Sequence, residues 1–299
     1  MRWYKNPYLL LTLTAMFWSG NFVLARAIHA DIPPLALSFW RWVIALLVVL
    51  PFVIKPLKQQ WPLLKAQWQR VVLLALTGIS GFNSLVYLGT QHTTATNALL
   101  INAFIPVWTI LLSVIFLRMK LIRMQFIGVF ISITGVMVIL SRGDWQVFSA
   151  MQFNQGDLLI FIAAVCWAVY TLLMKELDAR LNRIVFLAVI IFIGILGILP
   201  FYAWEALHTA PLHITHEIIA SFIYVGIFPS VLAVWFYNYG VGKVGPARAS
   251  LFIHLMPVFG TLMSVTFIGE TFYFYHVLGI TAIFSGIFLS TRNNNEQQV

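Results

Sequence analysis

The side chains that could do chemistry in this sequence are aromatic rings, amides and an imidazole that stand inside long apolar runs. Trp18 and Asn21 lie three residues apart, and Trp167 and Tyr170 repeat that spacing. Three residues are close to one helical turn, so each pair is expected to share a helical face. Rings beside a few amides suit a small, partly apolar solute. We therefore predict a substrate-binding site made by Trp18, Asn21, Asn83, Tyr87, Asn102, Trp167, Tyr170 and His254.

The same residue types also have a structural use, and that alternative stays open for each single residue. Asparagines hydrogen-bond between helices in membrane proteins, and tryptophans pack. His254 lies three residues before Pro257, so it could bind substrate, transfer a proton, or hydrogen-bond to a backbone group that the proline leaves free. Taken as a set, these residues favour binding.

Acidic residues are missing from the middle of the apolar runs. All nine fall in predicted loops or at predicted helix ends: Asp31, Asp144, Asp157, Glu176, Asp178, Glu205, Glu217, Glu270 and Glu296. A cation exporter coupled to protons would need a carboxylate near the membrane midplane. Neutral, zwitterionic or anionic solutes therefore fit this chain better than cations.

Enzyme chemistry has little support in the pattern. An intramembrane enzyme acting on lipids is the alternative function, but it needs a nucleophile–base pair or a carboxylate cluster at one depth, so we predict no catalytic residue. The single cysteine, Cys166, excludes an intramolecular disulfide and a multi-cysteine metal site. "GVGKVG" at 240–245 follows an apolar helix and not a strand, and "HITHE" at 213–217 has the wrong order for a zinc hydrolase. We predict no cofactor and no metal.

The composition indicates that membrane helices position these residues. The chain is 61% hydrophobic and 9% charged, with a mean hydropathy of +0.91, far from the values of a soluble domain. Runs of roughly 20 apolar residues are long enough to cross a bilayer. Ten such runs predict an all-α polytopic membrane protein with spans at about 8–28, 35–54, 71–90, 95–117, 124–141, 157–175, 184–204, 218–239, 247–268 and 273–291.

The basic residues predict the orientation. Of the 18 lysines and arginines, 15 fall in segments on one side of the predicted membrane, and Arg142 stands alone on the other side. Arg26 and Arg41 lie within spans. Basic residues gather on the cytoplasmic side, so we expect both termini in the cytoplasm and the protein in a bacterial inner membrane. The net charge of +9 is explained by topology, and no nucleic-acid partner is predicted.

The sequence also contains an internal repeat. "IPVWTILLSVIF" at 105–116 returns as "MPVFGTLMSVTF" at 256–267, which places Pro106 and Pro257 151 residues apart. Further pairs are Trp18 with Trp167, Pro51 with Pro200, Gly128 with Gly279, and Gly135 with Gly286. Each half has five spans, so the second starts on the opposite side of the membrane. We predict two inverted five-helix repeats, 1–147 and 148–299, as in alternating-access transporters.

The duplicated prolines predict where the site lies. In inverted repeats the site lies near the midplane between the halves, and broken helices are tolerated there because they border a cavity or other protein. Pro106 and Pro257 are therefore predicted helix breaks, with helix kinks that serve packing as the alternative.

Four stretches resemble the ten-helix EamA-type branch of the drug/metabolite transporter superfamily: "WSGNFVLARAI", "ALSFWRW", "ASLFIHLMPVFGTLMSVTFIGE" and "HVLGITAIFSGIFL". The resemblance covers nearly all of residues 7–291. It implies export or exchange of amino acids and other small metabolites. The first half departs from the pattern, because Arg118-Met119-Lys120 stands where the second half has Gly269-Glu270-Thr271. A role for Glu270 therefore has no counterpart in the first half.

Charged residues near the outer ends of spans form a last candidate group. Arg41, Glu270 and Arg26 are predicted close to the outer side. Arg41 and Glu270 could pair when an outer gate closes, or form a static ion pair that satisfies a buried arginine. We expect a secondary transporter that exports small, amino-acid-like metabolites by alternating access, with the bilayer and a small-molecule substrate as its partners. A monomer is sufficient for this function.

Overall fold

A computed structural model describes residues 5–28, 32–119, 123–149, 153–209, 215–269 and 271–291, and this part of the chain is helical without strands. The first half contains α1 (Pro7–Ile28), α2 (Pro34–Ala66), α3 (Trp68–Leu74), α4 (Phe82–Thr90), α5 (Ala95–Asn102), α6 (Ile105–Leu117), α7 (Arg123–Leu140) and the short α8 (Gln146–Ser149). The second contains α9 (Gln155–Lys175), α10 (Arg183–His208), α11 (His216–Val225), α12 (Ala233–Val244), α13 (Pro246–Leu251), α14 (Leu255–Met263) and α15 (Phe274–Thr291).

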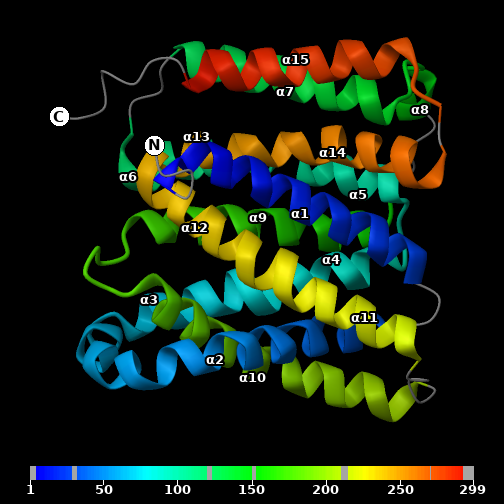
Figure 1. Ribbon diagram of the computed structural model, residues 1–299. Helices are drawn as coiled ribbons and strands as arrows, with labels where there is room; N and C mark the ends of the chain where they lie inside the picture. The colour runs from blue at the N-terminus through cyan, green and yellow to red at the C-terminus, as the bar shows by residue number, and fades with distance from the viewer. Residues whose placement is uncertain are drawn as a thin grey trace.

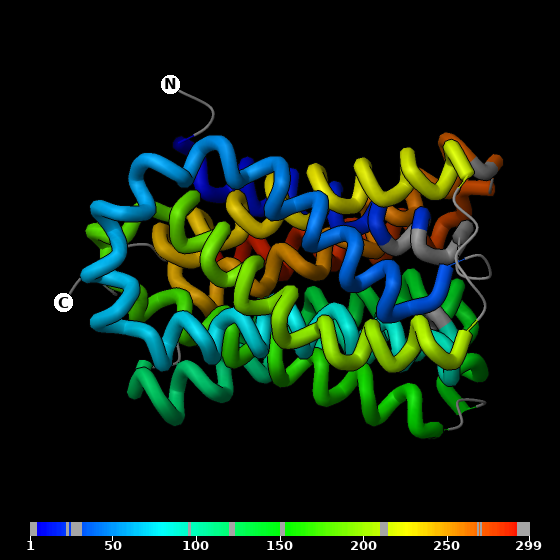
Figure 2. Tube along the Cα trace, turned by 90° about the horizontal axis from the view of Figure 1, so that it is seen from below, coloured from blue at the N-terminus to red at the C-terminus, as the bar shows by residue number. Residues whose placement is uncertain are grey.

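Nine helical segments among the described residues are long and apolar enough to cross a membrane. The 22-residue α1 precedes them, in agreement with about ten spans. The helices run roughly along one direction in two perpendicular views (Figures 1 and 2). Large apolar side chains cover the outside of the bundle, as expected for a surface in lipid, and well-exposed examples are Phe52, Ile54, Phe116, Phe126, Phe130 and Phe201.

Helix breaks recur at matching positions in the two halves. π-Helical segments join α3 to α4 at Ala75–Gly81 and α11 to α12 at Gly226–Leu232, which is a shift of 151 residues. A turn separates α5 from α6, and a 3₁₀ segment at Phe252–His254 separates α13 from α14. The breaks lie just in front of Pro106 and Pro257. Interrupted helices free backbone groups, so these are the places where polar side chains are needed.

The two halves interlock. α1 packs on α12 and α14, and its repeat partner α9 packs on α4 and α6. α2 pairs with α10 at one side of the bundle, and α7 pairs with α15 at the opposite side (Figure 1). The central space is therefore enclosed by helices from both halves.

Glycines set the α7–α15 contact. A Cβ added at Gly128 would lie 2.5 Å from the carbonyl oxygen of Gly286. A Cβ added at Gly135 would lie 2.6 Å from the carbonyl oxygen of Gly279. These four residues are the glycine pairs of the repeat, so the contact is symmetric about the crossing point. Only glycine lets the two backbones approach this closely.

The predicted connection between the second and third spans is wrong in detail. The segment 55–70 is not a loop, because α2 continues to Ala66 through Pro51, Pro56 and Pro62. At 1.5 Å per residue, 33 residues make about 50 Å of helix measured along its axis, more than a hydrocarbon core of about 30 Å requires. Lys55 and Lys58 are exposed on this extension, so their charged ends reach water. The connection 142–156 contains the short helix α8.

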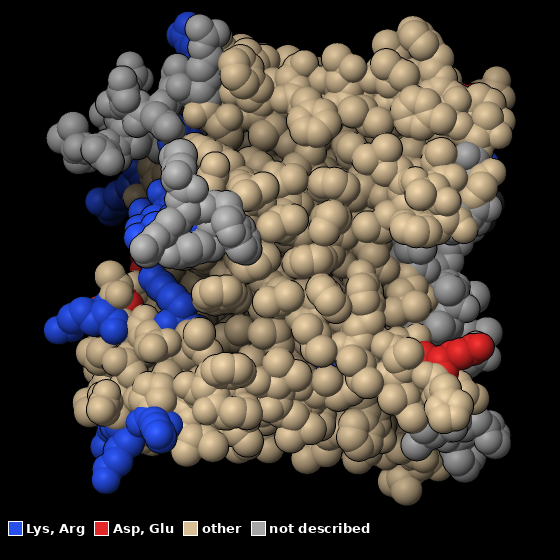
Figure 3. Space-filling view, viewed as in Figure 1, with Lys and Arg blue, Asp and Glu red and all other residues tan. Residues whose placement is uncertain are grey.

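The charges follow the predicted asymmetry. Most of the visible lysines and arginines gather at the end of the bundle that carries the α2–α3 connection, and the middle is almost free of charge (Figure 3). A wide uncharged band between charged ends is the surface expected of an integral membrane protein.

Candidate functional site

A cavity lies between the two halves of the chain. Its lining residues come from α1, α2, α4, α5 and α6 on one side and from α9, the α11–α12 connection, α12 and the α13–α14 region on the other. Six residues singled out by the sequence line it: Trp18, Asn21, Arg41, Asn83, Asn102 and Trp167. Trp42, Phe82, Ile105, Pro229, Val234, Ile253 and Met256 complete the lining.

Aromatic rings form one wall of the cavity. Trp18 and Trp167 meet edge to face with ring centroids 5.1 Å apart, and Phe82 lies 4.8 Å from Trp167. Trp18 Nε1–H donates to the Pro229 carbonyl at 3.1 Å. That carbonyl belongs to the π-helical segment of the second half, so the backbone of one half holds a ring of the other half in place.

Tyr170 lies behind this wall and does not line the cavity. Its ring stacks on Trp167 with centroids 5.0 Å apart, and its hydroxyl donates to Asn238 Oδ1 at 2.8 Å. The side chain is fully buried and packs against Gly78, where a Cβ would come within 2.3 Å of the ring. Tyr170 therefore positions Trp167 and is not placed to touch a solute.

Arg41 is buried and makes three hydrogen bonds with neutral groups. Nε donates to Ser230 Oγ at 2.9 Å, and Nη1 donates to Asn83 Oδ1 at 3.1 Å and to the Tyr87 hydroxyl at 2.5 Å. The guanidinium carbon lies 5.1 Å from the centroid of Trp42, a distance typical of a cation–π contact. Arg41 is thereby fixed from both halves of the chain.

Asn83, Tyr87 and Asn21 support this arrangement. Asn83 Nδ2 donates to the carbonyls of Gly78 and Ile79 at 3.3 Å each, so the amide uses backbone acceptors of the π-helical segment. Tyr87 donates to Asn21 Oδ1 at 3.5 Å. Tyr87 therefore connects Arg41 to Asn21 without lining the cavity itself.

His254 bonds to the backbone of the opposite half. Its Nε2 lies 2.8 Å from the Ala103 carbonyl oxygen, and its Nδ1 lies 2.6 Å from Ser132 Oγ. A carbonyl only accepts, so Nε2 carries the proton and Nδ1 accepts from the serine hydroxyl. Ala103 is the repeat equivalent of His254, and it lies at the break before Pro106. Of the three roles considered, this geometry matches the bond to a freed backbone group.

Asn102 stands out because no described residue satisfies its amide. Neither Oδ1 nor Nδ2 has a hydrogen-bond partner, although the residue is 5% exposed. Asn102 lines the cavity and also a smaller one beside His254. Buried amides are normally bonded, so this amide is available to a polar group that enters the cavity.

The predicted pair of Arg41 and Glu270 remains a prediction. Glu270 lies outside the described residues, as does the side chain of Arg26. No carboxylate within the described ranges forms an ion pair with Arg41.

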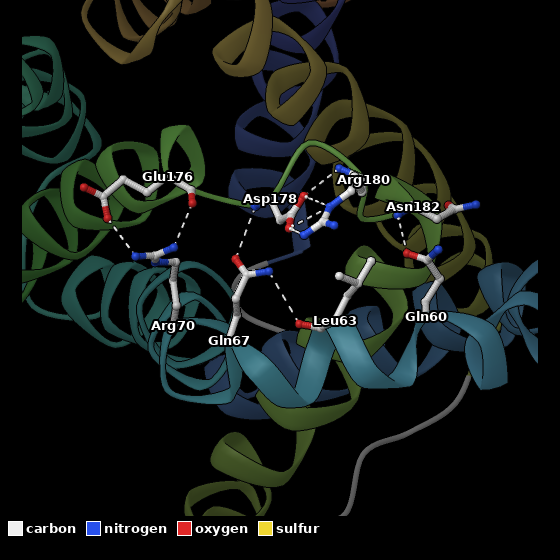
Figure 4. A network of polar contacts seen from close by, with 8 residues as sticks. All are labelled: Gln60, Leu63, Gln67, Arg70, Glu176, Asp178, Arg180 and Asn182. Atoms are coloured by element: carbon white, nitrogen blue, oxygen red, sulfur yellow. Dashed lines mark hydrogen bonds and ion pairs between the residues drawn. The ribbon is translucent and has the colours of Figure 1, made fainter.

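A polar network ties the two halves together at the basic end of the molecule (Figure 4). Arg70 forms an ion pair with Glu176 at 3.0 Å and donates to the Glu176 carbonyl at 2.7 Å. Gln67 Oε1 accepts from the backbone N–H of Asp178 at 3.2 Å. Gln60 Oε1 likewise accepts from the backbone N–H of Asn182 at 2.8 Å. The α2–α3 region of the first half thus holds the α9–α10 connection of the second.

At the opposite end, Glu205 joins the halves. Its two carboxylate oxygens accept from the backbone N–H groups of Leu35 at 3.0 Å and Ala36 at 2.8 Å. These donors lie in the first turn of α2, where a negative charge is favourable. Glu205 lies within α10 and is 5% exposed, so a residue predicted only as a helix end holds two helices together.

Two residues around Arg41 were not singled out from the sequence. Trp42 ends the stretch "ALSFWRW". Ser230 belongs to no motif, and a lone serine inside an apolar run is usually a helix-packing residue. The one available hint for Ser230 was its place directly after Pro229, since a proline in a membrane helix frees a carbonyl and disturbs the helix locally.

Known proteins resemble this chain over nearly its whole length. The model of the EamA-like transporter family matches residues 5–141 and again 154–292. An "Uncharacterized transporter" of Archaeoglobus fulgidus is 26% identical, with 98% of this chain and 99% of that protein covered. The "Uncharacterized transporter YyaM" of Bacillus subtilis is 25% identical, with 94% of this chain and 92% of that protein covered.

Two further comparisons bear on function and fold. A "Probable terminal-alkyne amino-acid exporter" of Streptantibioticus cattleyicolor is 26% identical, with 87% of this chain and 84% of that protein covered. A crystal structure superposes with a TM-score of 0.76 at 19% identity, covering 95% of this chain and 96% of that one, which shows the shared fold. Since the family model matches both halves, this chain belongs to the EamA-like transporter family of the drug/metabolite transporter superfamily.

Proposed function

We propose that this transporter exports small, amino-acid-like metabolites by alternating access, using the cavity between its two halves as the substrate site. The observation that carries the proposal is the cavity itself, which is lined from both halves beside their helix breaks. A solute held there contacts both halves, so relative motion of the halves can expose it to either side in turn.

The residue types support an amino-acid-like solute. Tryptophan and phenylalanine rings offer an apolar wall, and Asn21, Asn83 and Asn102 offer amides beside it. The described lining residues include no acid, which disfavours a cationic substrate. One relative is named an amino-acid exporter, and its name supports both the substrate class and the direction.

The charge distribution supports the orientation. We place both termini in the cytoplasm of a bacterial cell, with the protein in its inner membrane, because the basic residues gather at the end with the N-terminus and the α2–α3 connection. All described lining residues belong to one chain, which supports a monomer as sufficient for the site.

The rival function, an enzyme acting on lipids, has less support. It needs a nucleophile beside a base, and the described lining residues offer no such pair. The relatives compared above carry the names of transporters.

Transport by reconstituted protein tests the proposal. Proteoliposomes loaded with a mixture of amino acids should release a subset of them faster than protein-free liposomes. Val234→Phe narrows the cavity and should slow release, whereas Phe153→Ala, at a 91% exposed residue outside the cavity, should leave release unchanged. Equal release from all four preparations would contradict the proposal.

A further inference from the structure

The Arg41 guanidinium has an unused edge. Its three hydrogen bonds engage Nε and Nη1 only, and Nη2 has no hydrogen-bond partner among the described residues. Arg41 lines the cavity and is 3% exposed. A guanidinium carries five N–H donors in a fixed fork, so donors remain available on the cavity side.

No carboxylate among the described residues compensates the charge of Arg41. Its partners Ser230, Asn83 and Tyr87 are neutral, and it is the only lysine, arginine, aspartate or glutamate among the described lining residues. Removing a cation from water is costly unless an anion compensates it. An empty cavity with this composition therefore has a positive potential and favours a ligand with a negative group.

The side chain of Asn102 provides a second, independent sign of ligand binding in the same cavity. Both polar atoms of its buried amide lack a partner among the described residues. Such a group costs free energy in the empty protein, and the cost disappears when a ligand bonds to it. The cavity thus offers a cation and an unsatisfied amide beside an aromatic wall.

The guanidinium is held in place before a ligand arrives. Asn83, itself bonded to the Gly78 and Ile79 carbonyls, fixes Nη1, and Ser230 fixes Nε. The Trp42 ring lies 5.1 Å from the guanidinium carbon. A fixed guanidinium loses little freedom when it binds, which favours recognition of a planar carboxylate.

We propose that Arg41 binds the carboxylate of the transported solute, with the free guanidinium edge as donor and Asn102 bonding to a second polar group of the same molecule. The apolar part of the solute lies against Trp18, Trp167 and Phe82. This inference rests on the proposed function and narrows it, because a carboxylate becomes the required group, and amides and amines of the same shape are rejected.

Two matched series of compounds test the proposal. One comprises L-norvaline, L-norvalinamide, pentanoate and butylamine, and the other comprises L-phenylalanine, L-phenylalaninamide, 3-phenylpropanoate and 2-phenylethylamine. Each is added to the purified protein in lipid nanodiscs, and the melting temperature is followed by tryptophan fluorescence. At least one acid should raise the melting temperature, with an affinity at least about tenfold above that of its amide and amine, as expected for a charge-assisted bond.

Variants locate the effect at Arg41. Arg41→Gln should abolish the response to acids, and Arg41→Lys should keep a weaker response, because lysine offers a point charge without the fork. Asn102→Ala removes an unsatisfied group, so the ligand-free protein should melt at the same or a higher temperature while its affinity for the acid falls. This second variant keeps the test valid if Arg41→Gln fails to fold.

Several results would overturn the proposal: amides or amines that bind as well as acids, acids that bind Arg41→Gln with unchanged affinity, or no response of the wild-type protein to any acid. Sodium chloride and sodium phosphate are tested alongside, and equal responses to them would identify an inorganic anion site instead. Release measurements separate the two proposals. If proteoliposomes release amides and amines as fast as acids, the protein is a transporter and the carboxylate requirement is wrong.

Discussion

Trp18 and Trp167 occupy equivalent positions in the two halves of the sequence and contact each other edge to face, with ring centroids 5.1 Å apart. Residues related by an inverted repeat lie at equal depth only near the midplane, so their contact marks the middle of the bundle. The cavity opens beside this pair.

Trp167→Ala is expected to lower stability as well as binding. Trp167 is 3% exposed and contacts Trp18, Phe82, Tyr170 and Tyr237, so the cavity left by alanine should cost about 3–5 kcal/mol of unfolding free energy. Trp167→Phe keeps most of the packing and should melt closer to the wild-type temperature while still weakening ligand affinity. Unfolding in mixed micelles and ligand titration measure the two effects. A stable Trp167→Ala variant with normal transport would show that the ring is dispensable.

Gly128→Ala should separate α7 from α15. The new Cβ would lie 2.5 Å from the Gly286 carbonyl oxygen, so the backbones must move apart, at a cost of about 1–3 kcal/mol. Gly242→Ala is the matched control, because the atom nearest to its Cβ is the end of the Arg183 side chain at 3.8 Å. That variant should be unchanged or slightly stabilised, since alanine favours helix. Equal melting temperatures for both variants would contradict the close α7–α15 contact.

Asp178 should make stability depend on pH at the basic end. Hydrogen bonds from Arg180 lower the pKa of the Asp178 carboxyl to about 2, below its ordinary value of about 3.9. A lowered pKa in the folded state contributes stability above the unfolded pKa and loses it as pH falls towards the folded pKa. The difference in melting temperature between wild type and Asp178→Asn should therefore be largest above pH 4 and shrink towards pH 2. In Arg180→Gln the folded-state pKa of Asp178 should move back towards its unfolded value, so replacing Asp178 there should change the pH dependence of stability much less. A pH-independent difference between wild type and Asp178→Asn would refute the pairing.

Cysteine labelling tests the orientation. Cys166 is replaced by serine, and single cysteines are introduced at His92, Thr271 and Lys58, all of which are exposed. An impermeant thiol reagent added to intact cells should label positions 92 and 271 and spare position 58 until the cells are opened. Labelling of position 58 from outside would invert the topology.

The predictable part of the fold followed from apolar length and repetition. Patterns that extend over many residues predict the ten spans and the resemblance of the sequence to the EamA family. The duplicated proline stretches likewise indicate where the helices are interrupted. The exact position of a single side chain, and the partner it contacts in the other half, were not predictable. Tyr170 was expected to line the site, but its ring stacks on Trp167 and its hydroxyl bonds to Asn238, a contact between distant parts of the chain that no spacing indicates.

In the site, too, some residues could be predicted from the sequence and others could not. Arg41 and Asn102 were found because polar groups in a membrane are conspicuous, and their use in binding stays a prediction. The acceptor of Arg41 in the other half, Ser230, could not be found, because no spacing links two residues that meet only after folding. The length of α2 was missed because prolines at 51, 56 and 62 normally end a helix.

The arginine and the histidine at the centre of this protein are each present in single copy on a duplicated scaffold. Shifted onto the other half, Arg41 falls on Ile190 and His254 falls on Ala103. Exchanging the roles of the halves interconverts inward-open and outward-open geometries in an inverted repeat, yet here it also moves a charge and an imidazole into new surroundings. Under the alternating access proposed above, the two geometries should therefore differ in free energy even without solute, and the empty carrier should populate them unequally. We expect the residues that differ between the halves, and not the shared framework, to set which side the carrier faces at rest.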